Sequence, residues 1–311
     1  MRVAATIGWI GRMMIRAGVL LLLFVGYQLW GTGIHTSRAQ EDLERQFRAA
    51  REAAASATVT TRAPDAGPAE PATAPADLPP PAPGTPVGRI LIPDIGVDFI
   101  FVEGVDLRYL ESGPGHFPST PLPGQPGNAA LAGHRTTYAA PFHRLDELAP
   151  GDLITVETLQ GSFTYEVLPQ AVDPATPPQG HRIVTPDQLE ILDDKGDNRL
   201  TLMACHPKYS AARRIVVEAK LTNPPAPPTP RAEGLEANPF VGEDLTGGNP
   251  AARLPATLWS AAVLAVWVGA WWVARRRPRL RWPAYTVALP LWAVCLYAAF
   301  ENINELLPNA Y

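Results

Sequence analysis

Apolar residues are spread very unevenly along this 311-residue chain, and their distribution leaves one stretch able to form a globular domain. Uncharged apolar runs cover residues 17–34, 254–273 and 283–300. Each is close to the about 20 residues that a helix needs to cross the ~30 Å hydrocarbon core of a bilayer. Between the first two runs, residues 88–221 form the stretch that is long enough to bury a core.

Proline-rich segments separate this central stretch from the apolar runs. Nine of the 35 prolines fall at positions 64–86, and a second run, NPPAPPTP, covers residues 223–230. Proline removes a backbone donor and restricts the residue before it, so both runs are predicted to be extended spacers. Ahead of the first spacer, the charged and alanine-rich residues 36–56 are typical of a solvent-exposed helix.

These patterns predict six divisions of the chain. They are a cytoplasmic N-terminus with a transmembrane anchor (1–35), a helical stalk and Ala/Pro-rich linker (36–86), a globular domain (87–222), a Pro-rich and polar linker (223–252), a two-span transmembrane hairpin (253–301) and a C-terminal tail (302–311). For the first apolar run, a cleaved signal peptide is the alternative. No clear small-residue cleavage site follows Trp30, which favours an uncleaved anchor.

Arginine clusters predict the orientation of the chain in the membrane. Three arginines precede the first apolar run, and five more lie at positions 275–281, between the last two runs. Positively charged loops stay in the cytoplasm. With three spans and both clusters inside, the N-terminus is cytoplasmic and the central domain is extracellular. The net charge of -4 is mild and does not indicate a nucleic-acid partner.

Short β-type runs dominate the central stretch. Seven are predicted, at residues 89–92, 98–102, 129–132, 153–157, 162–168, 199–204 and 215–221. Turn residues such as PDIG and DDKGDN separate them, and short helical turns are expected at residues 106–111, 141–148 and 186–192. Many short strands with small helices predict a mainly β domain built as a closed or nearly closed barrel.

The two cysteines, Cys205 and Cys295, lie in segments of very different character, so no disulfide is expected between them. Cys295 falls inside the last apolar run, where a small packing role is expected. A free cysteine in an external domain is a liability unless its thiol is needed. Cys205 is therefore the candidate nucleophile.

Three reactive side chains stand at the ends of predicted strands. TLMACHPKYSAARRIVV puts Cys205 at the end of one strand and Arg214 at the start of the next, and LAGHRTTY puts His134 at the end of another. A nearby imidazolium and guanidinium favour the reactive thiolate. His134 can protonate a leaving amine, and Arg214 can stabilise an oxyanion. Strand neighbours point to opposite faces, so only one of Arg213 and Arg214 can face the thiol.

These segments resemble the sortase family, whose members carry a histidine, a Thr-Leu-x-Thr-Cys type segment and a downstream arginine on an eight-stranded barrel. GHFPSTPLPGQPGN before the histidine and Cys-His-Pro at the nucleophile are similar to class E, over residues 87–221. The resemblance implies a closed eight-stranded sortase-type β-barrel with catalytic His134, Cys205 and Arg214. Ala204 departs from the family, which usually has threonine before the cysteine.

The resemblance implies a cysteine transpeptidase of the hydrolase, or thiol protease, class. Family members cleave a C-terminal LPxTG-like sorting signal between threonine and glycine, with LAxTG preferred in class E. A thioacyl-enzyme forms and passes the protein to a cell-wall amine. The implied partners are surface proteins with that signal, a peptidoglycan precursor amine and the cell membrane. No cofactor is expected, nor a metal, because no residues show metal-ligand spacing.

Three further residues are candidates for substrate binding. Tyr138 follows the histidine loop, His116 lies in the Gly/Pro-rich segment GPGHFP, and His206 is adjacent to the nucleophile.

Two other functions stay open. The domain could be a catalytically degenerate sortase-like barrel that binds wall or protein partners, or an L,D-transpeptidase-like wall enzyme. The latter enzymes resemble a Ser-His-Gly-Cys pattern at the nucleophile, whereas this chain has Leu-Met-Ala-Cys.

Overall fold

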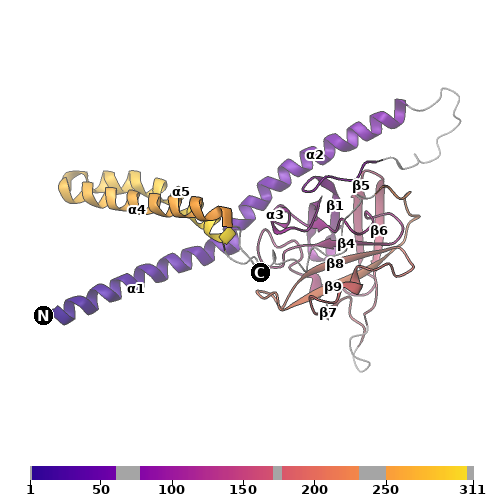
Figure 1. Cartoon of the computed structure of the whole chain (residues 1–311), viewed down its shortest axis with the longest axis horizontal. Coiled ribbons are helices and arrows are strands. Elements are labelled where there is room, and N and C mark those ends of the chain that lie inside the picture. Colours follow the sequence, from indigo (N-terminus) through magenta and orange to yellow (C-terminus); the bar gives the residue numbers. More distant parts are fainter. Residues whose placement is uncertain (1, 61–77, 171–176, 231–249, 307–311) are drawn as a thin grey trace. The chain divides into compact units, whose positions relative to one another are not determined.

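The computed structural model describes residues 2–60, 78–170, 177–230 and 250–306 (Figure 1). The chain divides into two compact units, residues 32–242 and a terminal unit made of residues 1–31 and 243–310. Residues 61–77 of the first predicted spacer, 231–249 of the second predicted linker and 307–311 of the predicted tail lie outside the described residues.

In the described part of the chain, nine strands form one sheet that curls into a barrel (Figure 1). They are β1 (Pro86–Ile92), β2 (Val97–Glu103), β3 (Gly115–His116), β4 (Asn128–Ala132), β5 (Leu153–Thr158), β6 (Gly161–Val167), β7 (Arg182–Val184), β8 (Arg199–His206) and β9 (Arg213–Leu221). Eight of them follow the order β6-β5-β1-β2-β3-β4-β8-β9, and pairing of β6 with β9 closes the ring. The predicted closed eight-stranded barrel is confirmed.

The two strands that the sequence did not predict are the shortest. β3 has two residues inside a Gly/Pro-rich loop, and β7 has three residues that pair with β9 outside the ring. Runs this short show no alternating pattern, so only pairing with a neighbour defines them. The predicted helical turns correspond to helix α3 (Leu107–Leu110) and to 3-10 turns at Leu145–Glu147 and Leu189–Ile191.

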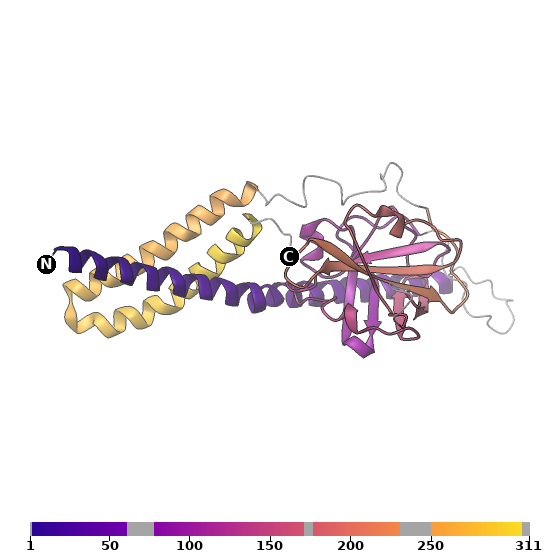
Figure 2. The same ribbon diagram turned by 90° about the horizontal axis from the view of Figure 1, so that it is seen from below.

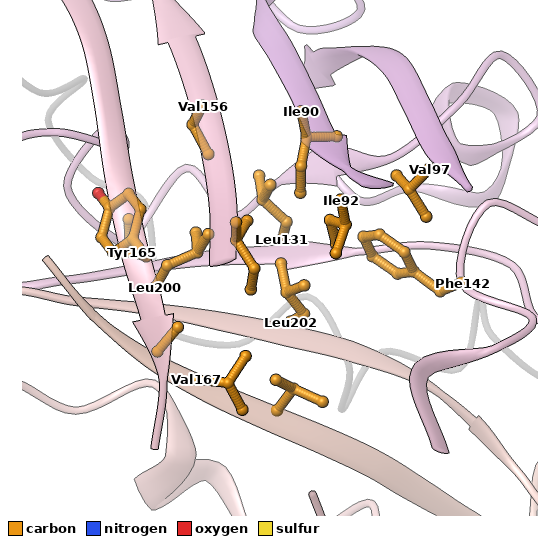
Figure 3. Close-up of a cluster of buried hydrophobic side chains, with 14 of the residues drawn as sticks. Ile90, Ile92, Val97, Leu131, Phe142, Val156, Tyr165, Val167, Leu200 and Leu202 are labelled. Carbon is orange, nitrogen blue, oxygen red and sulfur yellow. The ribbon is translucent and has the colours of Figure 1, made fainter. Parts of the chain in front are cut away.

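The barrel interior is filled by alternate residues of its strands (Figure 3). Ile90 and Ile92 on β1 are fully buried, as are Leu200 and Leu202 on β8. In each pair the side chains are two residues apart and point to the same face of the sheet. Leu131 of β4 lies among them in the same cluster. This packing fixes the strand ends that carry the reactive side chains.

Helix α2 (Thr32–Thr60) packs on the barrel rather than standing free as a solvent-exposed stalk. Leu43 and Phe47 lie on one face of α2, four residues apart, and contact Ile100 and Val102 of β2. The Gln40 side chain donates to the Ile100 carbonyl at 2.8 Å and accepts from the Ile100 amide at 2.7 Å. Charged residues dominate the composition of α2 and conceal this apolar face in the sequence.

The second proline run follows the barrel surface. The Ala226 amide donates to the Gly124 carbonyl at 2.8 Å, and Gln125 Nε2 donates to Thr229 Oγ1 at 2.9 Å. Contacts with the barrel therefore continue into the segment predicted as a linker from residue 223.

The terminal unit contains α1 (Arg2–Gly26), α4 (Arg253–Arg276) and α5 (Arg281–Leu306). α4 and α5 lie side by side (Figure 2). Within the described ranges, two helical segments are long and apolar enough to cross a membrane, Arg253–Arg276 and Pro278–Leu306. The predicted first span, residues 17–34, is divided between α1, a π-helical turn (Tyr27–Gly31) and α2, and it stays a prediction.

Aromatic contacts join the end of α1 and the π-helical turn that follows it to the C-terminal part of α5. The ring centroids of Phe24 and Phe300 are 5.1 Å apart, and those of Tyr27 and Tyr297 are 5.3 Å apart. The C-terminal ends of the two helices are therefore neighbours within this unit.

We expect Leu131→Ala to lower the free energy of unfolding of the barrel by about 2–5 kcal/mol, because it leaves a cavity in the core. Leu153→Ala is the matched control, since Leu153 is 50% exposed while Leu131 is fully buried. It should change that free energy by about 0.5 kcal/mol or less. Hydrogen exchange of β8 peptides in the full chain measures the free energy of unfolding of each variant. Equal decreases in the two variants would contradict the assignment of Leu131 to the core.

Candidate active site

Cys205 and Arg214 face each other across two neighbouring strands. The antiparallel register of β8 and β9 pairs Cys205 with Arg214 and His206 with Arg213. Residues paired in this way project their side chains from the same face of the sheet, and neighbours along a strand project from opposite faces. Arg214, rather than Arg213, therefore shares a face with the thiol. Its Nη1 donates to the carbonyl oxygens of Ala211 and Arg213 at 2.8 and 3.0 Å.

The end of β4 brings His134 beside the cysteine. β4 runs parallel to β8, and the Gly133 amide donates to the Met203 carbonyl at 3.0 Å. Continuing the register of the two strands puts His134 level with Cys205. A Cβ atom on Gly133 would lie 2.6 Å from the Phe142 ring, so only glycine fits there. The structure thus brings the three sequence-predicted residues to the ends of adjoining strands.

The loop after His134 holds an unusual backbone conformation. Residues 138–140 are not glycines, yet their φ angles lie between 45° and 59°, a region that costs such residues about 1 kcal/mol or more each. The buried Tyr138 ring lies 5.0 Å from the His134 ring, centroid to centroid. The Tyr138 hydroxyl donates to Glu111 Oε1 at 3.0 Å, and its amide donates to Thr32 Oγ1 of α2 at 3.1 Å. Tyr138 is thus a packing partner of His134, and its contact with a substrate stays a prediction.

Burial and charge act on the Cys205 thiol in opposite directions. Burial raises the pKa of Cys205, and this effect outweighs the lowering caused by the positive charges of Arg214 and Arg135. The sequence predicted the charge effect but not the burial, because the exposure of a strand end depends on the loops around it. Burial therefore favours the thiol form of Cys205 over the thiolate.

Arg135 is the component of this region that the sequence analysis missed. Its side chain is 2% exposed, and Nη2 pairs with Asp146 Oδ1 at 3.0 Å. Nη1 donates to the Cys205 carbonyl at 3.2 Å and to His206 Nδ1 at 2.9 Å. The available signal was a charged residue directly after His134, at the end of a strand that is otherwise buried.

His206 lies at the end of β8, where it accepts a hydrogen bond from Arg135. Because a guanidinium can only donate, Nδ1 is the acceptor and the neutral ring carries its proton on Nε2. Burial, followed by the charges of Arg135 and Arg213, lowers the pKa of His206. Its predicted role in substrate binding stays a prediction.

His116 lies in β3 and is 1% exposed. Its Nδ1 lies 2.8 Å from Glu103 Oε2, and its Nε2 lies 2.9 Å from the Pro121 carbonyl oxygen. Both ring nitrogens therefore have partners inside the fold, and substrate binding by His116 stays a prediction. Across residues 2–60, 78–170, 177–230 and 250–306, no group of three or more His, Cys, Asp or Glu side chains is placed to hold a metal ion.

Comparison with known proteins identifies the family. A model of the sortase domain matches residues 90–222, which include His134, Cys205 and Arg214. The chain belongs to the sortase family. This confirms the family that the motifs indicated and leaves the L,D-transpeptidase interpretation without support.

Two class E sortases of Streptomyces coelicolor are similar to this sortase. SrtE1 is 30% identical over 237 residues, which cover 72% of this chain and 58% of SrtE1. SrtE2 is 28% identical over 228 residues, which cover 71% of this chain and 84% of SrtE2. Among solved structures, the SrtF sortase from Corynebacterium diphtheriae is 31% identical, with 54% of this chain and 98% of SrtF covered and a TM-score of 0.44.

We expect the rate at which iodoacetamide alkylates Cys205 of this sortase to rise with pH and to reach half its maximum above the about 8.5 of an unperturbed thiol. Only the thiolate reacts, and burial keeps the thiol protonated to higher pH. Mass spectrometry of the Cys205 peptide measures the rate separately from Cys295. The same chain in denaturant is the reference, and a native midpoint below the denatured one would contradict the prediction.

Proposed function

We propose that this sortase is a membrane-anchored cysteine transpeptidase with Cys205 as nucleophile, His134 as general acid and base, and Arg214 as oxyanion donor. The observation that carries the proposal is the pairing of Cys205 with Arg214 across β8 and β9, with His134 at the adjoining end of β4. A sulfur, an imidazole and a guanidinium on adjoining strand ends are the groups that acyl transfer through a thioester needs.

In the first half-reaction, His134 takes the proton of the Cys205 thiol, and the thiolate attacks the threonine carbonyl of a sorting signal. Arg214 turns from its backbone acceptors to donate to the oxyanion that forms. The His134 imidazolium then protonates the leaving glycine amine as the peptide bond breaks. The products are a thioacyl-enzyme and a free glycine N-terminus, with the thiol proton on the leaving amine.

In the second half-reaction, an amine of a cell-wall precursor attacks the thioester. His134 accepts a proton from this amine and returns it to the departing sulfur of Cys205. The surface protein is thereby joined to the wall precursor through a new amide bond. The similarity to two class E sortases supports LAxTG as the preferred signal, ahead of LPxTG.

We further propose three membrane spans, with the N-terminus in the cytoplasm and the barrel outside. Two C-terminal spans are supported by the length and hydropathy of α4 and α5. The contact between Phe24 and Phe300 supports a third span, because it lets the C-terminal ends of α1 and α5 emerge on the same side. The arginines at positions 275–281 would then lie in the cytoplasm. An anchored enzyme with an external barrel suits a sorting substrate that is held in the same membrane.

We expect Arg214→Ala to lower kcat/KM for an LAxTG peptide by about 10²–10³-fold, because it removes an oxyanion donor. Arg213→Ala is the matched control, since Arg213 pairs with His206 and projects from the other face. It should lower kcat/KM by less than about 10-fold. Peptide cleavage with and without a diamine acceptor measures both steps.

Cys205→Ala should abolish both cleavage and diamine transfer in that assay. If Arg213→Ala lost as much activity as Arg214→Ala, the register assigned to the two arginines would be wrong. Cleavage of neither LAxTG nor LPxTG by the wild-type chain would reject the proposed substrate and favour a barrel that only binds its partner.

We expect a membrane-impermeant maleimide to label Leu153→Cys in intact cells and to label Arg279→Cys only after the membrane is permeabilised. Both substitutions are made in the full chain with Cys205→Ala and Cys295→Ala, which removes the native thiols. Leu153 is an exposed barrel residue, and Arg279 lies between α4 and α5. Labelling of both in intact cells would rule out the proposed orientation.

A further inference from the structure

Arg135 connects the two strand ends that carry the proposed acid and nucleophile. It follows His134 at the end of β4, and its guanidinium reaches the end of β8. There Nη1 donates to the carbonyl oxygen of Cys205 at 3.2 Å and to His206 Nδ1 at 2.9 Å. One buried side chain therefore contacts the nucleophile residue itself and the residue after it.

The charge of Arg135 is only partly offset by its ion-pair partner. Asp146 Oδ1 lies 3.0 Å from Arg135 Nη2, and Asp146 Oδ2 lies 3.7 Å from Lys208 Nζ. The Asp146 side chain is 37% exposed, whereas that of Arg135 is 2% exposed. Water screens an exposed carboxylate more strongly than a buried guanidinium. The positive charge of Arg135 therefore acts on Cys205 with only partial cancellation, in the direction that lowers the pKa of the thiol.

The other groups around the thiol are mostly cationic or neutral. The titratable and charged side chains around Cys205 and Arg135 come from β9, from the end of β8, from the loops after β4 and β8, and from the segment before β7: Arg213, Arg214, His206, His134, His143, Asp146, Lys208 and His181. Asp146 is the one carboxylate in this set. Its negative charge opposes the positive charge of Arg135, with which it pairs.

Lysine could not replace Arg135 fully at this position. The planar guanidinium forms directed bonds to the Cys205 carbonyl, to His206 and to Asp146 at once, whereas an ammonium is a compact charge without that fork. Arg135 also interacts with the loop that follows it, since its own carbonyl lies 2.7 Å from His143 Nδ1. The directed hydrogen bonds of Arg135 and its positive charge are therefore two separate contributions to the site.

We propose that Arg135 is a positioning residue for Cys205, which fixes the nucleophile's backbone beside His134 and stabilises the thiolate by its buried charge. This role rests on the proposed function, because it matters only if Cys205 reacts as a thiolate. Arg135 acts through the Cys205 carbonyl and through its field, and it contacts no substrate atom.

The test compares Arg135→Gln with Asp146→Asn in the full chain, by the pH midpoint of Cys205 alkylation. Arg135→Gln removes the positive charge and should raise the midpoint by about 1 pH unit or more. Asp146→Asn keeps an oxygen acceptor for Arg135 but removes the negative charge, so it should lower the midpoint. Opposite shifts support the proposal, whereas shifts in the same direction, or none, would overturn it.

Two further variants separate charge from geometry and guard against misfolding. Arg135→Lys should keep the midpoint near that of the wild type but lower kcat/KM by at least about 10-fold, since it retains charge without the directed bonds. Arg199→Gln is the matched control, because Arg199 begins the same strand and pairs with Asp197 and Glu218. It should leave the midpoint unchanged, and an equal shift there would overturn the proposal.

The alkylation readout needs no sorting peptide, so it stands apart from the proposed function. A wild-type chain that cleaves no peptide would defeat the transpeptidase proposal and with it the role of Arg135 in that reaction. A chain that cleaves peptides, with a midpoint unmoved by Arg135→Gln, would overturn the role of Arg135 alone. If Arg135→Gln fails to fold by circular dichroism, Asp146→Asn and Arg135→Lys still decide the question.

Discussion

The antiparallel ladder between β8 and β9 is the interaction on which the rest of this sortase depends. Its register buries Leu200 and Leu202 in the barrel and at the same time sets Cys205 opposite Arg214. A slip of one residue would reverse the face of every side chain on one strand and bring Arg213 or Ile215 opposite the thiol. The core residues thus specify the geometry of the candidate site, because burying the wrong face would cost far more than any one contact at the strand ends contributes.

The site lies where the hydrophobic core gives way to the loops, and this location explains its electrostatics. The loops cover Cys205 enough for burial to raise its pKa, while two guanidinium groups favour its charged form. On the other side of His134, a strained loop is held in place by Tyr138, whose hydroxyl and amide bond to Glu111 and to Thr32 of α2. Elements far apart in the sequence therefore determine how the imidazole and the thiol are presented.

Most of the barrel could be predicted from the sequence because its strands carry their own pattern. Seven runs of β-type residues between turns appear as β1, β2, β4, β5, β6, β8 and β9. The two missed strands are too short to show an alternation, and the packing of α2 depends on two apolar residues, Leu43 and Phe47, within a charged helix. The short strands and the packing of α2 are defined by the surfaces that they contact, so the local sequence does not predict them.

The sequence by itself predicted which residues would carry the chemistry, since Cys205, His134 and Arg214 each stand at the end of a run with a β-strand pattern. It could not determine the state of those groups. The burial that raises the pKa of Cys205 and the reach of Arg135 from the loop after β4 to the end of β8 are properties of loops and strands brought together by folding. Desolvation and charge act through space, so only the tertiary structure decided them.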